Sequence, residues 1–279
     1  MDARDAGVIH DYATTVVVMP AEHAVARVGV GDHTNDANRM LAVVRWLIEQ
    51  DFPAPRPLDG LAATHIRGRT ITFWRYYHQP VSSEGPPLDS AALGELVRRL
   101  HSLPEPPVKL PTWRPLLSLE QMVSDSGSNA VLSPSDRSWL LTRIPALRAE
   151  LERMDMPLGF GLIHGDAWAG NLMVDPARHT VLLGDWDSIA FGPREVDLVP
   201  SWHAARRYRN SPTWATRFAD RYGYDLSSSP AFDLLMEMRD FVQLSGPLRH
   251  AAHSPRHATA LRQRLDGTRA RDTHHWYEF

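Results

Sequence analysis

Residues 162–175 read LIHGDAWAGNLMVD, and residues 182–198 read LLGDWDSIAFGPREVDL. Short runs of Leu, Ile, Met and Val alternate here with Gly, Asp and Asn, a pattern typical of short strands that end in loops. We interpret 172–174 and 180–184 as the strands of a hairpin joined by the turn DPARH. The hairpin would bring the HGD loop and the DWD turn close together.

Three oxygen-bearing side chains are expected at the loop and strand-end positions of this hairpin, namely Asp166, Asn171 and Asp185. Two carboxylates and an amide oxygen converging on one point are hard ligands, and Mg²⁺ prefers a few such ligands together with water and phosphate oxygens. Phosphoryl transfer needs a group that accepts a hydrogen bond from the attacking hydroxyl and a cation that neutralises the phosphates. The residue types therefore indicate phosphoryl-transfer chemistry.

The flanking sequence predicts a β-rich segment followed by a mainly helical one. A Pro-rich and Ser-rich stretch at 81–90 separates them, and we place a lobe boundary near it. Pro145 is expected to kink or split its helix. The expected elements are strands at 14–20, 23–30 and 69–78, helices at 35–50, 89–103 and 133–154, and further helical patterns from 194 onward.

Composition excludes several classes of function. The chain has 279 residues, of which 43% are hydrophobic, and a net charge of −3, so no global field favours nucleic acid. It contains no cysteine, which excludes disulfides and thiolate chemistry. Its one lysine, Lys109, lies in a Pro-rich linker, which disfavours Walker A and Schiff-base sites. Neither a membrane span nor a secretory signal is recognisable, so we expect a cytoplasmic protein.

The order His164-Gly165-Asp166, Asn171, Asp185-Trp186-Asp187 resembles the aminoglycoside phosphotransferase family, within the protein-kinase-like fold that also holds the choline kinases. The segments AVARV, RMLAVVRWL, LGELVRRLHSL and GPREVDL fall where that family has corresponding elements. The resemblance implies an α+β, bilobal fold. A small β-rich N-lobe (1–80) would bind nucleotide, and a larger, mainly helical C-lobe (81–279) would carry catalysis and bind the acceptor.

The resemblance also implies roles for individual residues. Asp166 would be the catalytic aspartate, Asn171 and Asp185 would be Mg²⁺ ligands, and ATP or GTP would be the donor. The expected supporting residues are His164, Asp187 and Asp197. The expected nucleotide-binding residues are Arg27, Trp74 and Tyr76.

Two positions depart from the family pattern. Arg27 stands where a lysine or arginine contacts the phosphates, and its planar fork differs from the point charge of lysine. The following helix usually offers a glutamate to that basic residue. Here the position is Met40, with Asp36 one helical turn earlier as a substitute or with the ion pair missing.

The acceptor is expected to be a small molecule with a hydroxyl group. A polycationic aminoglycoside favours acidic pockets, yet arginines outnumber acidic residues after position 201. We therefore keep an aminoglycoside or other hydroxylated antibiotic beside an amino alcohol or a sugar. The weak substrate-binding candidates are Trp202, Glu237, Asp240 and Phe279.

Other hypotheses remain open at this point. A metallohydrolase would use His164 and Asp166 with further histidines, for which only His179 is near. A protein kinase would need an activation segment, and GPREVDL follows Asp187 too closely for one. A nucleotide-binding relative without catalysis is suggested by Met40. We expect a monomer or weak dimer that binds a nucleoside triphosphate and its acceptor, but neither nucleic acid nor a membrane.

Overall fold

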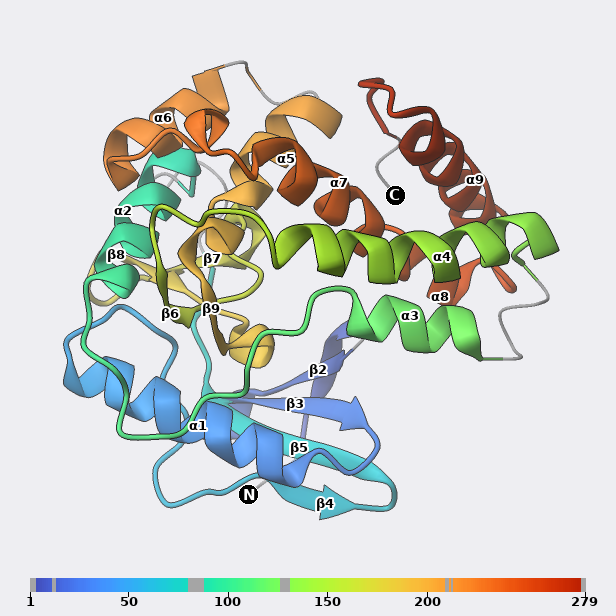
Figure 1. Cartoon of the computed structure of the whole chain (residues 1–279). Helices are drawn as coiled ribbons and strands as arrows, with labels where there is room; N and C mark the ends of the chain where they lie inside the picture. The colour runs from blue at the N-terminus through green and yellow to red at the C-terminus, as the bar shows by residue number, and fades with distance from the viewer. Residues whose placement is uncertain are drawn as a thin grey trace. The chain divides into compact units, whose positions relative to one another are not determined.

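The computed structural model describes residues 4–11, 14–79, 88–125, 131–208, 211 and 213–276. Its internal contacts divide the chain into two compact units (Figure 1). The first comprises Met1–Pro111 with Leu162–Phe191, and the second Thr112–Gly161 with Gly192–Phe279. The predicted lobe boundary after residue 80 falls in 80–87, outside the described residues, and stays a prediction.

A five-stranded antiparallel sheet forms the β-rich part of the first unit, in the order β1-β2-β3-β5-β4. The β-branched runs at 14–20 and 23–30 form neighbouring strands as predicted, with Val16 opposite Arg27. On the other side of β3, Val25 faces Trp74 and Arg27 faces Thr72. The strands are β1 (Gly7–Asp11), β2 (Thr14–Met19), β3 (Ala24–Val30), β4 (Thr64–Ile66) and β5 (Arg69–Arg75).

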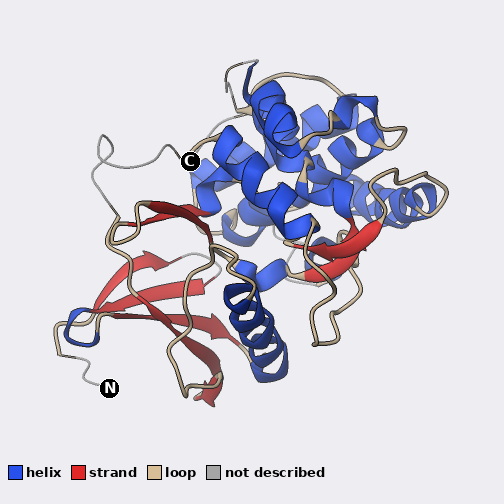
Figure 2. Cartoon of the chain, turned by 90° about the vertical axis from the view of Figure 1, so that its left-hand side faces the viewer, coloured by secondary structure: helices blue, strands red, loops and turns tan. Residues whose placement is uncertain are grey.

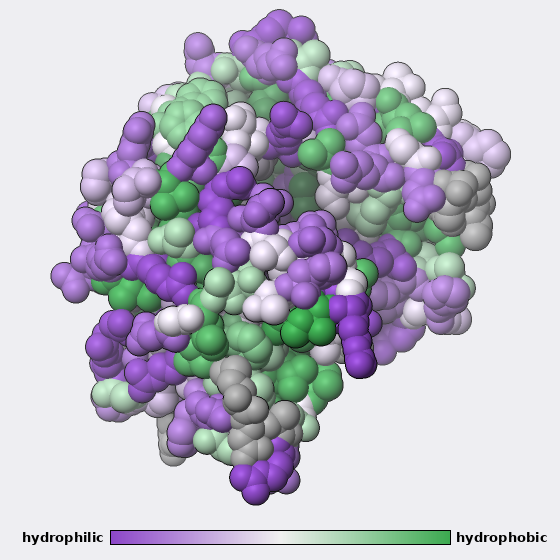
Figure 3. Space-filling view, turned by 90° about the horizontal axis from the view of Figure 1, so that it is seen from below, coloured by the Kyte–Doolittle hydropathy of each residue, from purple (hydrophilic) through white to green (hydrophobic). Residues whose placement is uncertain are grey.

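Several large hydrophobic side chains of this sheet remain exposed, namely Val8, Ile9, Val30 and Ile66. Figure 3 looks at the molecule from below and shows hydrophobic residues gathered between hydrophilic ones on that face. Strand β1, which carries two of the four, was not predicted from the sequence. It pairs antiparallel with β2 and forms the edge of the sheet.

Helix α1 (Thr34–Glu49) has the amphipathic stripe that its sequence predicts. Its buried side is lined by Met40, Leu41, Val43, Val44, Trp46 and Leu47. This helix packs against β5 and against the short 3-10 helix η4 (Trp186–Ser188). It therefore connects the sheet to the DWD turn.

The predicted hairpin is present. Strands β7 (Leu172–Asp175) and β8 (Thr180–Leu183) pair antiparallel, with Leu172 opposite Leu183. The short 3-10 helix η3 (Ala169–Asn171) leads into β7, and β6 (Phe160–Ile163) pairs with β9 (Ala190–Pro193). Helix α2 (Ser90–His101) packs near β8 and is capped by Asp89, which accepts from the N–H groups of Ala91 and Ala92.

The second unit is mainly helical, as predicted (Figure 2). One buried cluster joins most of its helices and includes Leu119, Ile144, Leu147 and Phe241. Its helices are α3 (Leu117–Ser124), α4 (Pro134–Leu151), α5 (Val199–Arg207), α6 (Thr213–Tyr222), α7 (Phe232–Val242), α8 (Ser245–His250) and α9 (Pro255–Ala270), with 3-10 helices η5 (Arg194–Asp197) and η6 (Leu226–Ser228).

The split expected at Pro145 was wrong. Helix α4 runs unbroken through Pro145, which lacks an N–H group to donate along the helix. Ile144 and Leu147 on either side are fully buried in the core cluster. This burial offsets the lost hydrogen bond, so the helix continues.

None of the described helices is both long and apolar enough to pass through a lipid bilayer.

Candidate active site

His164 connects the HGD loop to the DWD turn from inside the protein. It is fully buried, and its Nε2 lies 2.8 Å from the carbonyl oxygen of Gly184. The N–H of Asp166 donates to His164 Nδ1 at 3.3 Å, which fits a neutral ring with its proton on Nε2. The imidazole also packs on Trp186, with ring centroids 4.6 Å apart. These contacts suit the supporting role predicted for His164.

Gly165 explains why the loop begins with His-Gly-Asp. Its φ is +83°, a conformation that favours glycine. A Cβ atom at this position would lie 2.3 Å from the carbonyl oxygen of Ser188. The HGD loop therefore lies directly against the end of η4, and any side chain here would push the loop and the turn apart.

Asn171 joins the HGD loop to Asp185. Its Nδ2 donates to the carbonyl oxygen of Asp166 at 2.9 Å, and its own carbonyl oxygen accepts from Gly184 N–H at 2.9 Å. The first bond fixes the orientation of the Asn171 amide. Asp185 follows Gly184 directly and has a left-handed backbone, with φ 60° and ψ 61°.

Mg²⁺ fits this arrangement by the chemistry of its donors. Asn171 Oδ1 and the Asp185 carboxylate are hard oxygen donors of the type that Mg²⁺ prefers, and they would leave positions for phosphate and water. The Asn171 amide is held by the backbone of Asp166, and the Asp185 carboxylate by Arg27. Within the described ranges, no group of three or more His, Cys, Asp or Glu side chains could hold a metal by itself. The metallohydrolase hypothesis, which needs such a group, therefore gains no support from the described residues.

Arg27 reaches from β3 to the DWD turn. Its Nη2 lies 2.6 Å from Asp185 Oδ1 and 2.8 Å from Asp187 Oδ2, and its Nη1 lies 3.3 Å from Asp187 Oδ1. Desolvation raises the pKa of Asp187; Arg27 opposes this rise, and the like charge of Asp185 adds to it. Desolvation lowers the pKa of Arg27, but the two carboxylates outweigh this and keep it above its ordinary value. The sequence predicted a phosphate contact for Arg27 and did not foresee this pair.

Helix α1 offers Arg27 no carboxylate partner. Met40 is buried on its inner face, as the apolar stripe of the helix predicts. Asp36, the proposed substitute, instead pairs with Arg39 at 2.8 Å. Of the two alternatives, a substitute in Asp36 or a missing ion pair, the structure has no pair between strand and helix among the residues it describes, and Arg27 pairs with the DWD turn.

A cavity of about 500 Å³ lies beside these groups within the first unit. Trp74 and Tyr76, the residues predicted to flank the base, line it together with Arg27, Asn171 and Asp185. The N–H groups of Arg75 and Tyr76 are already bonded to the carbonyl oxygens of Arg56 and His23. Apolar walls come from Ile9, Val16, Val25, Leu172 and Met173.

Gln79 also lines this cavity and had no signal in the sequence. Its Oε1 accepts from the N–H of Val174 at 2.9 Å, and its Nε2 donates to the carbonyl oxygens of Val174 at 3.2 Å and Tyr77 at 3.0 Å. One side chain thus satisfies both backbone groups of a residue on β7. It fixes the chain after β5 to the hairpin.

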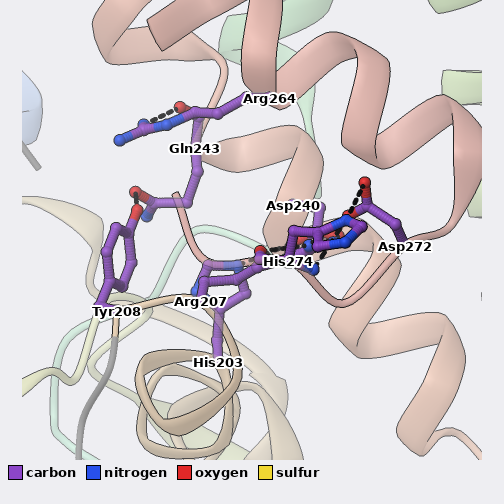
Figure 4. Close-up of polar contacts among 8 residues, drawn as sticks. All are labelled: His203, Arg207, Tyr208, Asp240, Gln243, Arg264, Asp272 and His274. Carbon is purple, nitrogen blue, oxygen red and sulfur yellow. Dashed lines mark hydrogen bonds and ion pairs between the residues drawn. The ribbon is translucent and has the colours of Figure 1, made fainter. Parts of the chain in front are cut away.

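The acidic substrate candidates of the second unit are paired with arginines. Glu237 bonds Arg143, with Oε1 2.7 Å from Nε and Oε2 2.8 Å from Nη2. Asp240 is buried and accepts from Arg207 through both of its oxygens and from His203 at 2.9 Å. Figure 4 shows this second group, in which Arg207 from α5 also reaches Asp272 beyond α9.

Three further residues have roles predicted from the sequence. Trp202 is buried and packs edge-on against Phe218, with centroids 5.6 Å apart. Asp197 is fully buried at the end of η5. Phe279 lies outside the described residues. The roles given to these residues stay predictions.

The fold is similar to that of several solved kinases. The microcompartment-associated aminopropanol kinase has a TM-score of 0.67 at 19% identity, covering 95% of this chain and 90% of the other. The APH(2")-IIIa complex with GDP and kanamycin has a TM-score of 0.65 at 15% identity, covering 97% and 95%. The aminoglycoside phosphotransferase APH(3'')-Id from Streptomyces rimosus has a TM-score of 0.57 at 22% identity, covering 84% and 92%.

These likenesses confirm the predicted kinase-like fold class. No curated protein matches the chain. The sequence does match the phosphotransferase enzyme family over residues 13–235, which include strands β2 to β5 of the sheet, the HGD loop and the DWD turn. This match spans most of the chain, and the chain therefore belongs to the phosphotransferase enzyme family.

Proposed function

We propose that this phosphotransferase transfers the γ-phosphoryl group of ATP or GTP to a hydroxyl of a small molecule. The observation that carries the proposal is the hydrogen-bonded link from Asp166 through Asn171 to Gly184 and Asp185, beside a cavity of about 500 Å³. This link supports a candidate base next to two candidate cation ligands, Asn171 and Asp185, which line a pocket large enough for a nucleotide.

In the proposed reaction, Asp166 accepts a hydrogen bond from the acceptor hydroxyl and takes its proton as the oxygen attacks. A bond forms between that oxygen and the γ-phosphorus, and the bond from the γ-phosphorus to the β–γ bridging oxygen breaks, which releases the nucleoside diphosphate. Asn171 and Asp185 would hold Mg²⁺, which would neutralise the phosphate charge. Arg27 is within the same pocket and would donate to phosphate oxygens.

The cavity supports the assignment of the base site to Trp74 and Tyr76. Because the N–H groups of Arg75 and Tyr76 are engaged elsewhere, we assign recognition of the base edge to the backbone from Tyr77 onward. The similar structures include two solved with ADP and one solved with GDP. Both donors therefore belong in the test.

For the acceptor we propose an aminoglycoside or another hydroxylated antibiotic, which would make the enzyme a resistance-type kinase. The similar structures include complexes with streptomycin and kanamycin. An amino alcohol is the second candidate, and one observation favours it. Glu237 and Asp240 are each neutralised by an arginine, so they offer little net charge to a polycation. An acceptor with a single amine needs fewer carboxylates.

The test is acceptor-dependent release of ADP or GDP, measured separately with each donor against aminoglycosides, other hydroxylated antibiotics, amino alcohols and sugars. We expect release with at least one acceptor, and its loss in Asp166→Ala. Nucleotide binding without release above that variant, across the whole panel, would instead support a non-catalytic relative.

A further inference from the structure

Arg27 occupies an oxygen that the proposed cation needs. Its Nη2 lies 2.6 Å from Asp185 Oδ1, a distance typical of a charge-assisted hydrogen bond. The same nitrogen lies 2.8 Å from Asp187 Oδ2, so one guanidinium bridges both carboxylates of the DWD turn. A divalent cation and this guanidinium are both positive, and they compete for the same carboxylate.

In the part of the chain that the structure describes, the partners of Arg27 lie in the turn. Among the described residues, the carboxylates that contact Arg27 belong to Asp185 and Asp187. Met40 supplies no charge from α1, and Asp36 is held by Arg39. A second cavity of about 370 Å³, lined by Arg27, Asp36, Met40 and Asp187, lies at this side of the strand. It places Met40 near Arg27 without giving it a carboxylate.

Two neighbouring carboxylates without a counter-ion would repel each other. Asp185 and Asp187 are about half exposed, with side-chain exposures of 45% and 50%, so solvent weakens the repulsion but does not remove it. The guanidinium therefore neutralises the charge of the two carboxylates, as a divalent cation would. The arginine reaches the turn from a different element, β3, which makes the contact breakable without unfolding the hairpin.

We propose that Arg27 is an exchangeable counter-ion: it neutralises Asp185 and Asp187 in the nucleotide-free chain, and it moves to the phosphates when the cation and nucleotide bind. This inference rests on the proposed function, because it assumes that the cation and phosphates meet at Asp185. Arg27 would be a positioning residue for the cation as well as a phosphate contact.

The exchange links the two ligands. A cation alone must displace Arg27, and a metal-free nucleotide must draw Arg27 away from two carboxylates, so each binds weakly by itself. When both are present, the cation replaces Arg27 at the carboxylates, and the phosphates of the nucleotide accept the hydrogen bonds that Arg27 gives up there. By thermodynamic reciprocity, the cation strengthens nucleotide binding by the factor by which the nucleotide strengthens cation binding.

The decisive measurement is Mn²⁺ binding to the nucleotide-free chain, followed by electron paramagnetic resonance. Removing the competitor with Arg27→Gln should tighten Mn²⁺ binding by about threefold to tenfold, the range expected for one or two partly exposed ion pairs. The same variant should bind ADP more weakly. The two affinities would move in opposite directions, which a merely structural role does not predict.

Two controls keep the measurement specific. Arg178→Gln removes an arginine of the same unit that pairs with Asp175 in the hairpin, away from Arg27, and it should leave Mn²⁺ binding unchanged. Asp185→Asn should abolish Mn²⁺ binding and so identify the site. Unchanged or weaker Mn²⁺ binding in a folded Arg27→Gln variant would overturn the proposal.

A second variant tests the exchange with Arg27 in place, and it decides the question if Arg27→Gln does not fold. Met40→Glu gives the guanidinium a carboxylate on α1, and Met40→Gln is its uncharged control. We expect tighter Mn²⁺ binding in the glutamate variant alone; equal affinities in the two variants would count against the exchange. Because no acceptor or turnover enters, these results can fail while the phosphotransferase assay succeeds, and the reverse.

Discussion

The buried cluster around His203 makes the stability of the second unit sensitive to pH. Burial lowers the pKa of His203 to about 4 from an ordinary 6.5, although the nearby Asp240 opposes the shift. Asp240 already has a cation in Arg207, and Arg239 and Arg207 further disfavour a second positive charge. The rings of Tyr208 and Trp276 pack on the imidazole. His203 is therefore held neutral in the folded chain.

The direction of this pH dependence follows from proton binding to His203 in the folded and unfolded chains. Since the pKa is lower in the folded chain, the unfolded chain binds the proton more readily between pH 6.5 and pH 4. The free energy of unfolding therefore falls as pH falls through this range. With these two pKa values, His203 lowers the free energy of unfolding by less than about 0.1 kcal/mol at pH 7.5 and by about 1.4 kcal/mol at pH 5.5. A loss of this size lowers the melting temperature by about 3 °C.

The assay compares thermal and urea unfolding at pH 7.5, 6.5 and 5.5 for the wild type and His203→Gln. The glutamine amide can donate to Asp240 as the neutral ring does, but it does not titrate. We expect the wild type to lose about 1 kcal/mol more than the variant between pH 7.5 and 5.5. His253→Gln, which removes an exposed imidazole from the same unit, should keep the wild-type dependence. Equal pH dependence in the wild type and His203→Gln would refute the reasoning.

Three substitutions in the first unit test the site directly. Asp166→Ala should lower kcat by about 10²–10⁴-fold, because it removes the base and positioning group, with nucleotide affinity kept; full activity with any acceptor would contradict that role. Asp185→Ala should remove the Mg²⁺ dependence of nucleotide binding, and calorimetry with and without metal would detect a dependence that persists. Gln79→Leu leaves the N–H and C=O of Val174 without its amide and should cost about 1–3 kcal/mol in urea unfolding, with weaker nucleotide binding. An unchanged unfolding midpoint would show that solvent replaces the Gln79 bonds.

Local patterns predicted the elements that carry the site. The hairpin, helix α1 and strands β2 and β3 follow from alternation and helical stripes that each segment contains by itself. The closeness of Asn171 and Asp185 also follows from the sequence, because a hairpin with a short turn must bring its two ends together. Gly165 belongs to the HGD motif, and the structure shows why a glycine is needed there: a side chain would meet the carbonyl oxygen of Ser188.

Pairing across long sequence separations could not be predicted in the same way. Arg27 and Asp187 are 160 positions apart, and Gln79 and Val174 are 95 apart. Nothing in either neighbourhood shows which partner tertiary packing will select. Asp240 is an example. Its charge suggested that it binds an amine of the substrate, whereas the fold pairs it with Arg207.

Lys109 gives the molecule a practical property. It is exposed in the linker after α2, and it is the only lysine in the chain. An amine-reactive dye can therefore attach only there and at the amino terminus. A chain in which arginine replaces nearly every lysine thus accepts a defined fluorescent reporter without any engineered cysteine.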